Sequence, residues 1–170
     1  MLAKAPTPSS PPLRGIIEFM KLTTRSEYAL LALVYLARQP KDSITSTDAI
    51  ARAQGIPAKF LEQLLLAMRM AHFVRSTKGK MGGYALAKDP KDISMAEIIR
   101  LFDGALAPTE SVSSFFYEPT PIEKEKGLVL VLRDIRDYVS FKLEHTTIAD
   151  VAAVEVLPDI DTEDEETPDI

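Results

Sequence analysis

The strongest constraint on the fold is a sharp turn at Gly55 and Pro57 between two helix-like segments. Gly55 can adopt the left-handed backbone that ends a helix, and Pro57 has the fixed φ angle that suits the first position of the next helix. The helix before the turn should begin at a capping box formed by Thr45 and Asp48. Its apolar side chains that should face a core are Ile50 and Ala53. The sequence therefore predicts two helices joined by a short, angular turn.

The second helix, at 57–71, has one apolar and one polar face. Apolar residues recur at three- and four-residue steps, as in a helix that buries one side, at Phe60, Leu61, Leu64, Leu65 and Met68. The opposite face carries Lys59, Glu62 and Gln63 in the first turns. In a DNA major groove Gln63 can pair with adenine, Glu62 can accept from cytosine, and Lys59 can reach guanine or a phosphate. An ordinary solvated helix face is the alternative, and the context favours DNA.

That context is a glycine-rich ribbon after the second helix. Residues 73–76 and 84–86 resemble two short strands, and 77–83 form a flexible tip with Lys78 and Lys80. The lysines could lie along a phosphate backbone, although an ordinary surface hairpin has the same pattern. The G-x-x-x-x-G-K-[ST] spacing of a nucleotide-binding loop is absent. The sequence predicts a mainly α fold with a small β-wing, a winged helix-turn-helix, and double-stranded DNA as its partner.

Two further helices begin with predicted capping boxes, Thr24 with Glu27 and Ser94 with Glu97. The first should run through Ala37 and the second should stop at Gly104. Apolar side chains of the first helix can build the domain core, namely Ala29, Leu30, Leu33, Val34 and Leu36. These helices complete the predicted domain around the helix-turn-helix pair.

A long C-terminal helix is predicted from Gly127 to about Glu144, with a length of about 27 Å. Its apolar residues cover a wide part of its surface, at Leu128, Val131, Leu132, Ile135, Tyr138, Val139, Phe141 and Leu143. A helix of this kind needs a partner surface, and the domain before it is too small to cover it alone. Packing within one subunit is the alternative to a second chain.

The overall charge of −5 hides a strong asymmetry. Residues 1–90 carry 13 Lys and Arg against 6 Asp and Glu, a net +7, whereas residues 91–170 carry 7 against 19, a net −12. Local potential attracts phosphate, and the basic half contains the helix-turn-helix. From Glu155 onward the chain has eight carboxylates and no base, the pattern of a solvated acidic tail. The tail could serve solubility or compete with DNA for the basic face.

Five motifs resemble the Rrf2-type bacterial transcription regulators from Met20 to about Val151. They are MKLTTRSEYALLAL (20–33), IPAKFLEQLLLAMRMAHFVRS (56–76), KGKMGGYALAK (78–88), ISMAEIIRLFDG (93–104) and TTIADV (146–151). The resemblance implies that Lys59, Glu62 and Gln63 occupy the groove-reading part of the recognition helix, and that Lys78 is the basic residue of the wing. It also implies phosphate-side contacts from Arg25 and Tyr28, although Tyr28 could equally be a half-buried core residue.

The resemblance further implies a homodimer, in which the long helix packs against the same helix or the winged domain of a second chain. A dimer would place two recognition helices on successive major-groove faces of a near-palindromic operator. The best-known members of the family bind an iron–sulfur cluster through three cysteines after the DNA-binding domain. Those positions align near Ser114, Thr120 and Lys126, and the chain has no cysteine. Hydroxyls and an ammonium cannot replace thiolates, so no cluster or other cofactor is expected.

Neither histidine suggests a metal site. His72 should end a helix, because histidine tolerates left-handed backbone better than most residues, and His145 should lie near a helix C-terminus, where the dipole favours a cation. Neither lies in a cluster with carboxylates at ligand spacing. The chain also lacks a cysteine nucleophile and a recognisable Ser/His/Asp arrangement, so an enzyme is not expected.

The expected organisation has five parts. They are a disordered proline-rich leader (1–19), the DNA-binding domain (20–104), a loop where the family places its sensor (105–126), the dimerisation helix with a short terminal helix (127–154) and the acidic disordered tail (155–170). No secretory signal or membrane-spanning stretch is apparent, which predicts a cytoplasmic protein. The expected function is a DNA-binding repressor, and the alternative is a winged-helix module that acts through a protein partner. An effector, if there is one, could be a small molecule or a protein.

Overall fold

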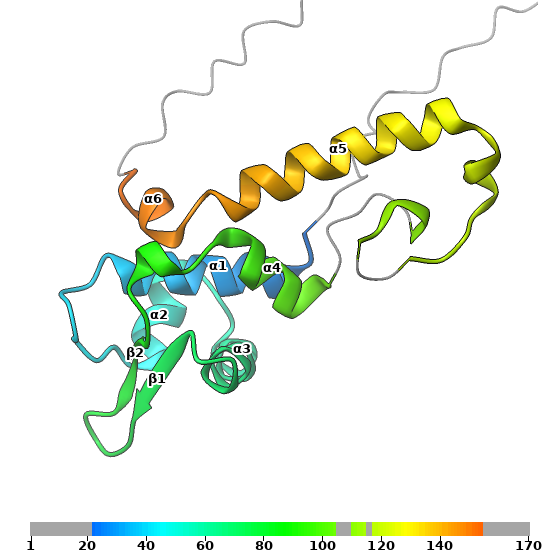
Figure 1. Ribbon diagram of the computed structural model, residues 1–170. Helices are drawn as coiled ribbons and strands as arrows, with labels where there is room; N and C mark the ends of the chain where they lie inside the picture. The colour runs from blue at the N-terminus through cyan, green and yellow to red at the C-terminus, as the bar shows by residue number, and fades with distance from the viewer. Residues whose placement is uncertain (1–21, 105–109, 115–116, 155–170) are drawn as a thin grey trace, which may run out of the picture.

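The computed structural model describes residues 22–104, 110–114 and 117–154 of the 170-residue chain. Short helices surround a core, a two-stranded hairpin projects from one side, and a long helix extends away above them (Figure 1). The elements are α1 (Thr24–Ala37), α2 (Thr47–Gln54), α3 (Ala58–Met70), β1 (Val74–Thr77), β2 (Gly83–Leu86), η3 (Pro90–Asp92), α4 (Met95–Asp103), η4 (Glu110–Val112), η5 (Pro121–Lys124), α5 (Lys126–Glu144) and α6 (Ile148–Ala152). The leader expected at 1–19 and the tail expected at 155–170 lie outside the described residues.

The core forms around α1, which contacts α2, α3, α4 and α6. The expected apolar face of α1 is buried, with Val34 half-buried, and α3 buries Leu61, Leu64, Leu65 and Met68. In α2 Ile50 is buried as predicted, but Ala53 is exposed and Ala51 is buried in its place. The predicted inward position of Ala53 was therefore wrong by about half a turn of the helix.

The predicted start of α2 was also wrong, by one residue. Ser46 is the N-cap, and its Oγ accepts a hydrogen bond from the backbone N–H of Ala49 at 3.2 Å. Thr45 instead pairs its backbone with Tyr84 of the wing, with N···O distances of 2.9 and 2.8 Å. Because its backbone is held in an extended bridge to the wing, Thr45 does not cap α2. The next residue with a hydroxyl group, Ser46, is the N-cap.

The capping box predicted at Thr24 and Glu27 does not form either. Thr23 is the N-cap of α1, and no side chain within the helix caps it. The carboxylate of Asp103, at the end of α4, accepts from the Thr23 N–H at 3.0 Å, from the Thr23 hydroxyl and from the Ser26 Oγ at 2.6 Å. Ser26 is fully buried. A carboxylate 80 residues away in sequence thus replaces the local cap of α1.

Other helix ends agree with the sequence. Ser94 and Glu97 form a complete capping box at the start of α4, and Gly104 is its C-cap. Gly55 ends α2 in the left-handed region at φ 65°, although Pro57 is the N-cap of α3 and not its first helical residue. His72 follows α3 with φ 62°, as expected for a residue that ends a helix. The hairpin pairs Val74 with Leu86 at one end and Thr77 with Gly83 at the other.

The C-terminal part returns to the core. The expected loop at 105–126 contains two short 3₁₀ helices, η4 and η5, and within it Ser111, Val112 and Ser113 are buried. The 19-residue helix α5 has no buried residue, and Arg100 of α4 bonds Ser140 and Glu144 near its C-terminal end. After α5 the chain turns back, and Ile148 of α6 is fully buried against α1. The short terminal helix, grouped in the sequence with the dimerisation helix, packs on the winged domain.

Candidate nucleic-acid interface

The outer face of α3 is polar and open. Lys59, Glu62 and Gln63 are all exposed, because the apolar residues at the intervening positions face the core. Within the described ranges none of the three side chains makes a hydrogen bond or an ion pair. They are therefore free to meet the edges of base pairs, and each has the donor or acceptor chemistry for a major groove.

The angle of α3 is set at its N-terminal end. Gly55 has left-handed backbone, and Ile56 is buried while its N–H donates to the Ala51 carbonyl at 2.9 Å. Phe60 then meets the ring of Tyr28 edge to face, with centroids 5.7 Å apart. Tyr28 is half-buried against the core, so it positions α3 in addition to any contact its hydroxyl could make.

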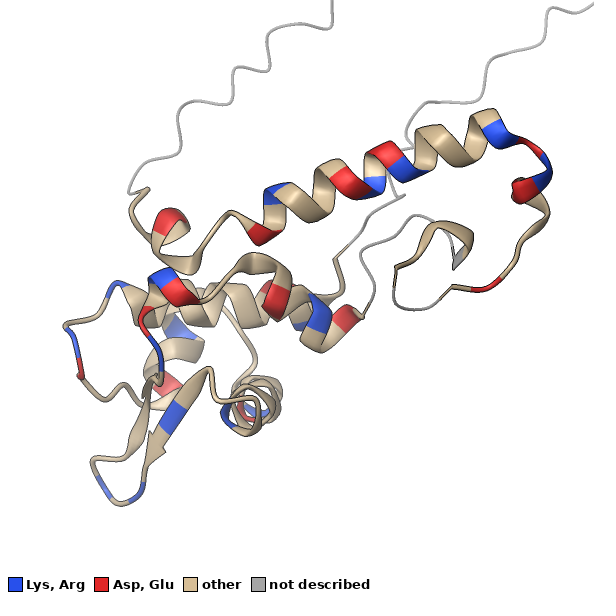
Figure 2. Cartoon of the chain, viewed as in Figure 1, with Lys and Arg blue, Asp and Glu red and all other residues tan. Residues whose placement is uncertain are grey.

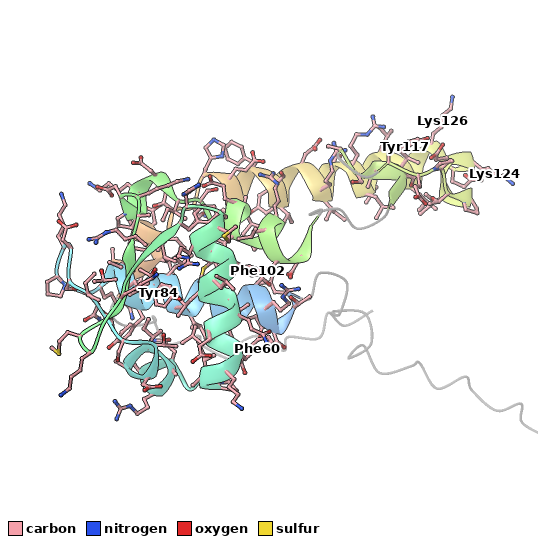
Figure 3. The ribbon with its side chains drawn as sticks, turned by 90° about the horizontal axis from the view of Figure 1, so that it is seen from below. Phe60, Tyr84, Phe102, Tyr117, Lys124 and Lys126 are labelled. Atoms are coloured by element: carbon pink, nitrogen blue, oxygen red, sulfur yellow. The ribbon has the colours of Figure 1, made fainter. Side chains whose placement is uncertain are left out.

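Arg25 precedes Tyr28 by about one turn of α1 and meets a different aromatic ring. Its guanidinium carbon is 5.5 Å from the centre of the Phe102 ring of α4. Figure 3 labels Phe60 and Phe102 at separate positions in the winged domain. Arg25 is exposed and keeps its donors available, since a stacked guanidinium can still donate at its edges.

The wing presents two free lysines. Lys78 and Lys80 are exposed at the tip between β1 and β2, where Figure 2 shows the only charged segments of the turn. Gly79 has φ 110°, and the Gly82 N–H donates to the Gly79 carbonyl at 2.9 Å. A side chain at Gly82 would collide with the Thr77 and Gly79 carbonyls. The glycines therefore make a tight tip that holds both lysines outward.

Two contacts that sequence reasoning missed hold the wing relative to α3. The backbone pair of Thr45 and Tyr84 joins β2 to the loop before α2, and Gly83 packs so closely on the Thr45 carbonyl that a side chain there would collide with it. On the other strand, Arg69 of α3 donates to the Ser76 Oγ at 3.2 Å. An alternating pattern cannot reveal a single-residue bridge, but the glycine at 83 was its one signal.

The residues expected to form a dimer share one side of α5 but differ in exposure. Leu128, Val131, Ile135 and Tyr138 recur at three- and four-residue steps and are exposed, Tyr138 at 71%. Leu132 and Val139, on the same side of the helix, are half-buried. We call the four exposed residues the α5 stripe. Figure 1 shows α5 extending well beyond the helices of the winged domain.

Comparison with known proteins places the chain among transcription regulators. Residues 22–154 match the family model Rrf2, described as an iron-dependent transcriptional regulator. The chain is 34% identical over 134 residues to the helix-turn-helix transcriptional regulator CymR of Bacillus subtilis. The aligned region covers 79% of this chain and 91% of CymR.

Solved structures show the same architecture. The structure of CymR, the global cysteine regulator of B. subtilis, superposes with a TM-score of 0.64 at 32% identity and covers 78% of this chain and 95% of CymR. The structure of IscR from T. potens gives a TM-score of 0.59 at 29% identity, with 77% and 85% coverage. The winged helix-turn-helix fold predicted from the sequence is confirmed.

The iron in the family description does not fit the donor groups of this chain. The sequence has no cysteine, and among the described residues no three His, Asp or Glu side chains gather as a metal site. Of the positions aligned with cluster ligands, Ser114 is exposed, Thr120 donates to the Ser111 Oγ at 3.0 Å, and Lys126 begins α5. Hydroxyls and an ammonium do not supply the thiolates that such a cluster needs.

Proposed function

The chain belongs to the Rrf2 family of transcription regulators, and from that membership we propose that it is a homodimeric repressor of a near-palindromic operator. Its relatives are regulators and not enzymes. In the proposed complex α3 lies in the major groove, the wing lies along the neighbouring backbone, and the protein blocks access to the promoter. We place this activity in the cytoplasm; in the described part of the chain, no helix is long and apolar enough to cross a membrane.

One observation carries the DNA-binding proposal: an exposed, unpaired polar face on α3 stands beside a lysine-tipped wing that is fixed to it. The face comprises Lys59, Glu62 and Gln63, and the wing contributes Lys78 and Lys80. Fixed relative placement matters because an element that enters the groove with its position already set loses less conformational entropy on binding. Phosphate contacts from the wing would set the register, and base contacts from α3 would supply specificity.

The homodimer rests on the α5 stripe. A row of exposed apolar side chains on a 19-residue helix exceeds what a monomer usually leaves in water. We assign the stripe to a second copy of the chain, because α5 extends past its own domain and a two-fold axis makes the surface self-complementary. Two recognition helices related by that axis would meet half-sites about 34 Å apart.

The decisive experiment measures binding of the purified protein to the DNA upstream of its own gene and to a scrambled duplex of equal length, at low and at physiological salt. We expect a preference for the native fragment that survives physiological salt. Affinity should also fall steeply with salt, by roughly 10³ or more when six to ten phosphates are contacted. Weak, equal binding to both duplexes that vanishes with salt would contradict specific regulation at that promoter.

The same experiment separates the alternative function, a winged-helix module that acts through a protein partner. A module of that kind has no reason to prefer one duplex over another. If the protein showed no sequence preference at any salt concentration and bound an acidic protein tightly, the exposed face of α3 would be a protein-docking surface.

A further inference from the structure

A cavity of about 440 Å³ lies at the root of the wing, away from the outer face of α3. Its walls come from the C-terminal end of α1, the loop from α1 to α2, and the residues that enter and leave the hairpin. Figure 1 shows this loop running beside the upper end of β2. The volume is within the range of pockets that hold small metabolites.

A polar side chain without a hydrogen-bond partner belongs to the wall of the cavity. Ser43 lines it, and the Ser43 Oγ is the one buried side-chain oxygen or nitrogen in the described residues that makes no hydrogen bond. Buried hydroxyls in native proteins are nearly always bonded, so the Ser43 hydroxyl retains a hydrogen bond that it can make to a ligand. A serine hydroxyl can donate to an acceptor that enters the cavity.

The charges around the cavity favour an anion. Three cations line it, Lys41, Arg75 and Lys88. Of the two carboxylates present, Asp42 pairs with Arg75 at 3.0 Å and Asp89 accepts from the Lys91 N–H at 3.0 Å. Lys41 and Lys88 have no carboxylate partner in the part of the chain that the structure describes, and the Lys88 ammonium lies 4.7 Å from the centre of the Phe73 ring.

The remaining walls favour an organic ligand over a bare ion. Leu36, Ala37 and Leu86 supply apolar surface to the same cavity. An inorganic anion would leave this surface in water, whereas an aliphatic chain would cover it.

We propose that this cavity, which we call the wing-root site, binds a small organic carboxylate. The carboxylate accepts from the Ser43 hydroxyl and pairs with the ammonium groups of Lys41 and Lys88, while its aliphatic part lies on Leu36 and Leu86. The polar face of α3 supplies none of these groups, so binding of the carboxylate can be measured without DNA.

Occupancy of the wing-root site would be transmitted to the DNA-binding elements. The loop that carries Ser43 continues to Thr45, which is bonded to Tyr84 of the wing, and then to Ser46, the cap of α2. A ligand that holds this loop selects one position of the wing relative to the helix-turn-helix. We therefore expect the carboxylate to change DNA affinity as well as thermal stability.

The test first measures the melting temperature of the full chain, without DNA, in acetate, butyrate, succinate, inorganic phosphate or sodium chloride at equal ionic strength. The anion that raises the melting temperature most is then titrated into the protein by calorimetry, which gives its affinity. We expect butyrate or succinate to raise the melting temperature above phosphate and chloride. In Lys41→Gln/Lys88→Gln the affinity for that anion should fall about tenfold or more, the loss of about one charge-assisted hydrogen bond. Lys124→Gln/Lys126→Gln, which removes the same two charges at the far end of the molecule (Figure 3), should leave it unchanged.

The variant Ser43→Ala separates a loss of carboxylate binding from a loss of folding stability. It removes an unbonded hydroxyl, so the melting temperature without anion should not fall, yet the carboxylate should bind several-fold more weakly. A carboxylate effect no larger than that of chloride, or equal binding in the double variant and the wild type, would overturn the proposal. A phosphate effect as large as that of butyrate would mean an adventitious ion only. Because DNA is absent, each result is separate from the outcome of the promoter experiment.

Discussion

At the scale of single residues, the proposed complex divides DNA recognition between side chains with different tasks. Gln63 stands on the exposed face of α3 without a partner among the described residues, and Lys78 stands at the tip of the wing. An amide can read one base by two hydrogen bonds, whereas an ammonium attracts any phosphate. The two positions should therefore respond differently to substitution.

We expect Gln63→Ala to relax the preference for one base pair, at a cost of about 1–3 kcal/mol on the preferred sequence. Lys78→Ala should weaken binding to all sequences and reduce the salt slope by about one unit. Fluorescence anisotropy with a set of single-base operator variants at two salt concentrations measures both effects. Equal losses on every sequence for both variants would contradict this division.

Asp103 is a residue whose role lies in stability. Its carboxylate accepts from Thr23 and from the buried Ser26, and it caps α1 from the end of α4. Asp103→Ala should lower the free energy of unfolding by about 1–3 kcal/mol, since it removes a cap and leaves a buried hydroxyl with one acceptor fewer. Urea denaturation measures the loss. The matched control is Asp92→Ala on exposed η3, and an equal effect of the two substitutions would rule out a capping role.

At the scale of elements, the wing depends on backbone contact more than on side chains. Each strand has four residues, which is too short for a hairpin to be stable alone. The bridge from Thr45 to Tyr84 and the hydrogen bond from Arg69 to Ser76 attach it to the helices. The close approach at Gly83 is what makes the bridge possible.

Gly83→Ala should separate β2 from the Thr45 carbonyl and leave the wing mobile. We expect lower DNA affinity. The slope of log affinity against log salt concentration should also become smaller, by up to about two units if both tip lysines lose their phosphate contacts. Gly127→Ala is the control, because a methyl group there meets open space. Hydrogen exchange of the hairpin amides reports the loosening directly, and unchanged protection in the Gly83 variant would show that the bridge is dispensable.

The contact between α4 and α5 depends on an exposed charge pair. Hydrogen bonds from Arg100 and then from Ser140 hold the pKa of Glu144 below its usual range. A carboxylate with a lowered folded pKa contributes stability above its unfolded pKa, and this contribution is lost as pH falls through the folded pKa. Glu144→Gln should therefore be less stable than the wild type near about pH 7, by an amount that shrinks as the pH is lowered to about 3. Because the pair is exposed, the difference is small.

Urea denaturation of both proteins at the two pH values measures the contribution of Glu144. A difference that persists at the lower pH would assign the effect to packing of α5 and not to the carboxylate charge.

At the scale of the whole molecule, α5 and α6 perform separate tasks although they adjoin in sequence. α6 closes the core of the winged domain through Ile148, whereas α5 leaves its apolar stripe in solvent. The protein is thus a stable DNA-binding unit joined to a helix that has more apolar surface than its own chain covers. Dimerisation supplies the missing cover in the proposed assembly.

Ile135→Asp introduces a charge into the centre of the α5 stripe. We expect dissociation to a monomer and a DNA affinity lower by about two orders of magnitude or more, because the second half-site no longer adds to the first. Sedimentation or light scattering at micromolar concentration measures the change. Leu130→Asp, at a more exposed leucine outside the stripe, should leave the dimer intact. A wild-type monomer at that concentration would remove the basis for a symmetric operator.

The sequence by itself determined the elements whose causes are local. The left-handed glycine at 55, the capping box at Ser94 and Glu97, and the helical period of 60–68 each depend on residues within one or two turns, so the helix-turn-helix could be predicted, together with the exposed face of α3. The composition likewise determined that no thiolate is available for a cluster.

Only the tertiary structure decided where distant groups meet. Asp103 replaces the local cap of α1, Thr45 pairs with the wing and shifts the start of α2, and Leu132 and Val139 are half-buried while their neighbours on α5 are exposed. The wing-root cavity likewise joins residues from α1 to η3. The local sequence pattern cannot predict these contacts, because a hydrogen-bonding group bonds to whichever partner the packing of the chain brings close to it. That partner can lie 80 residues away in the sequence.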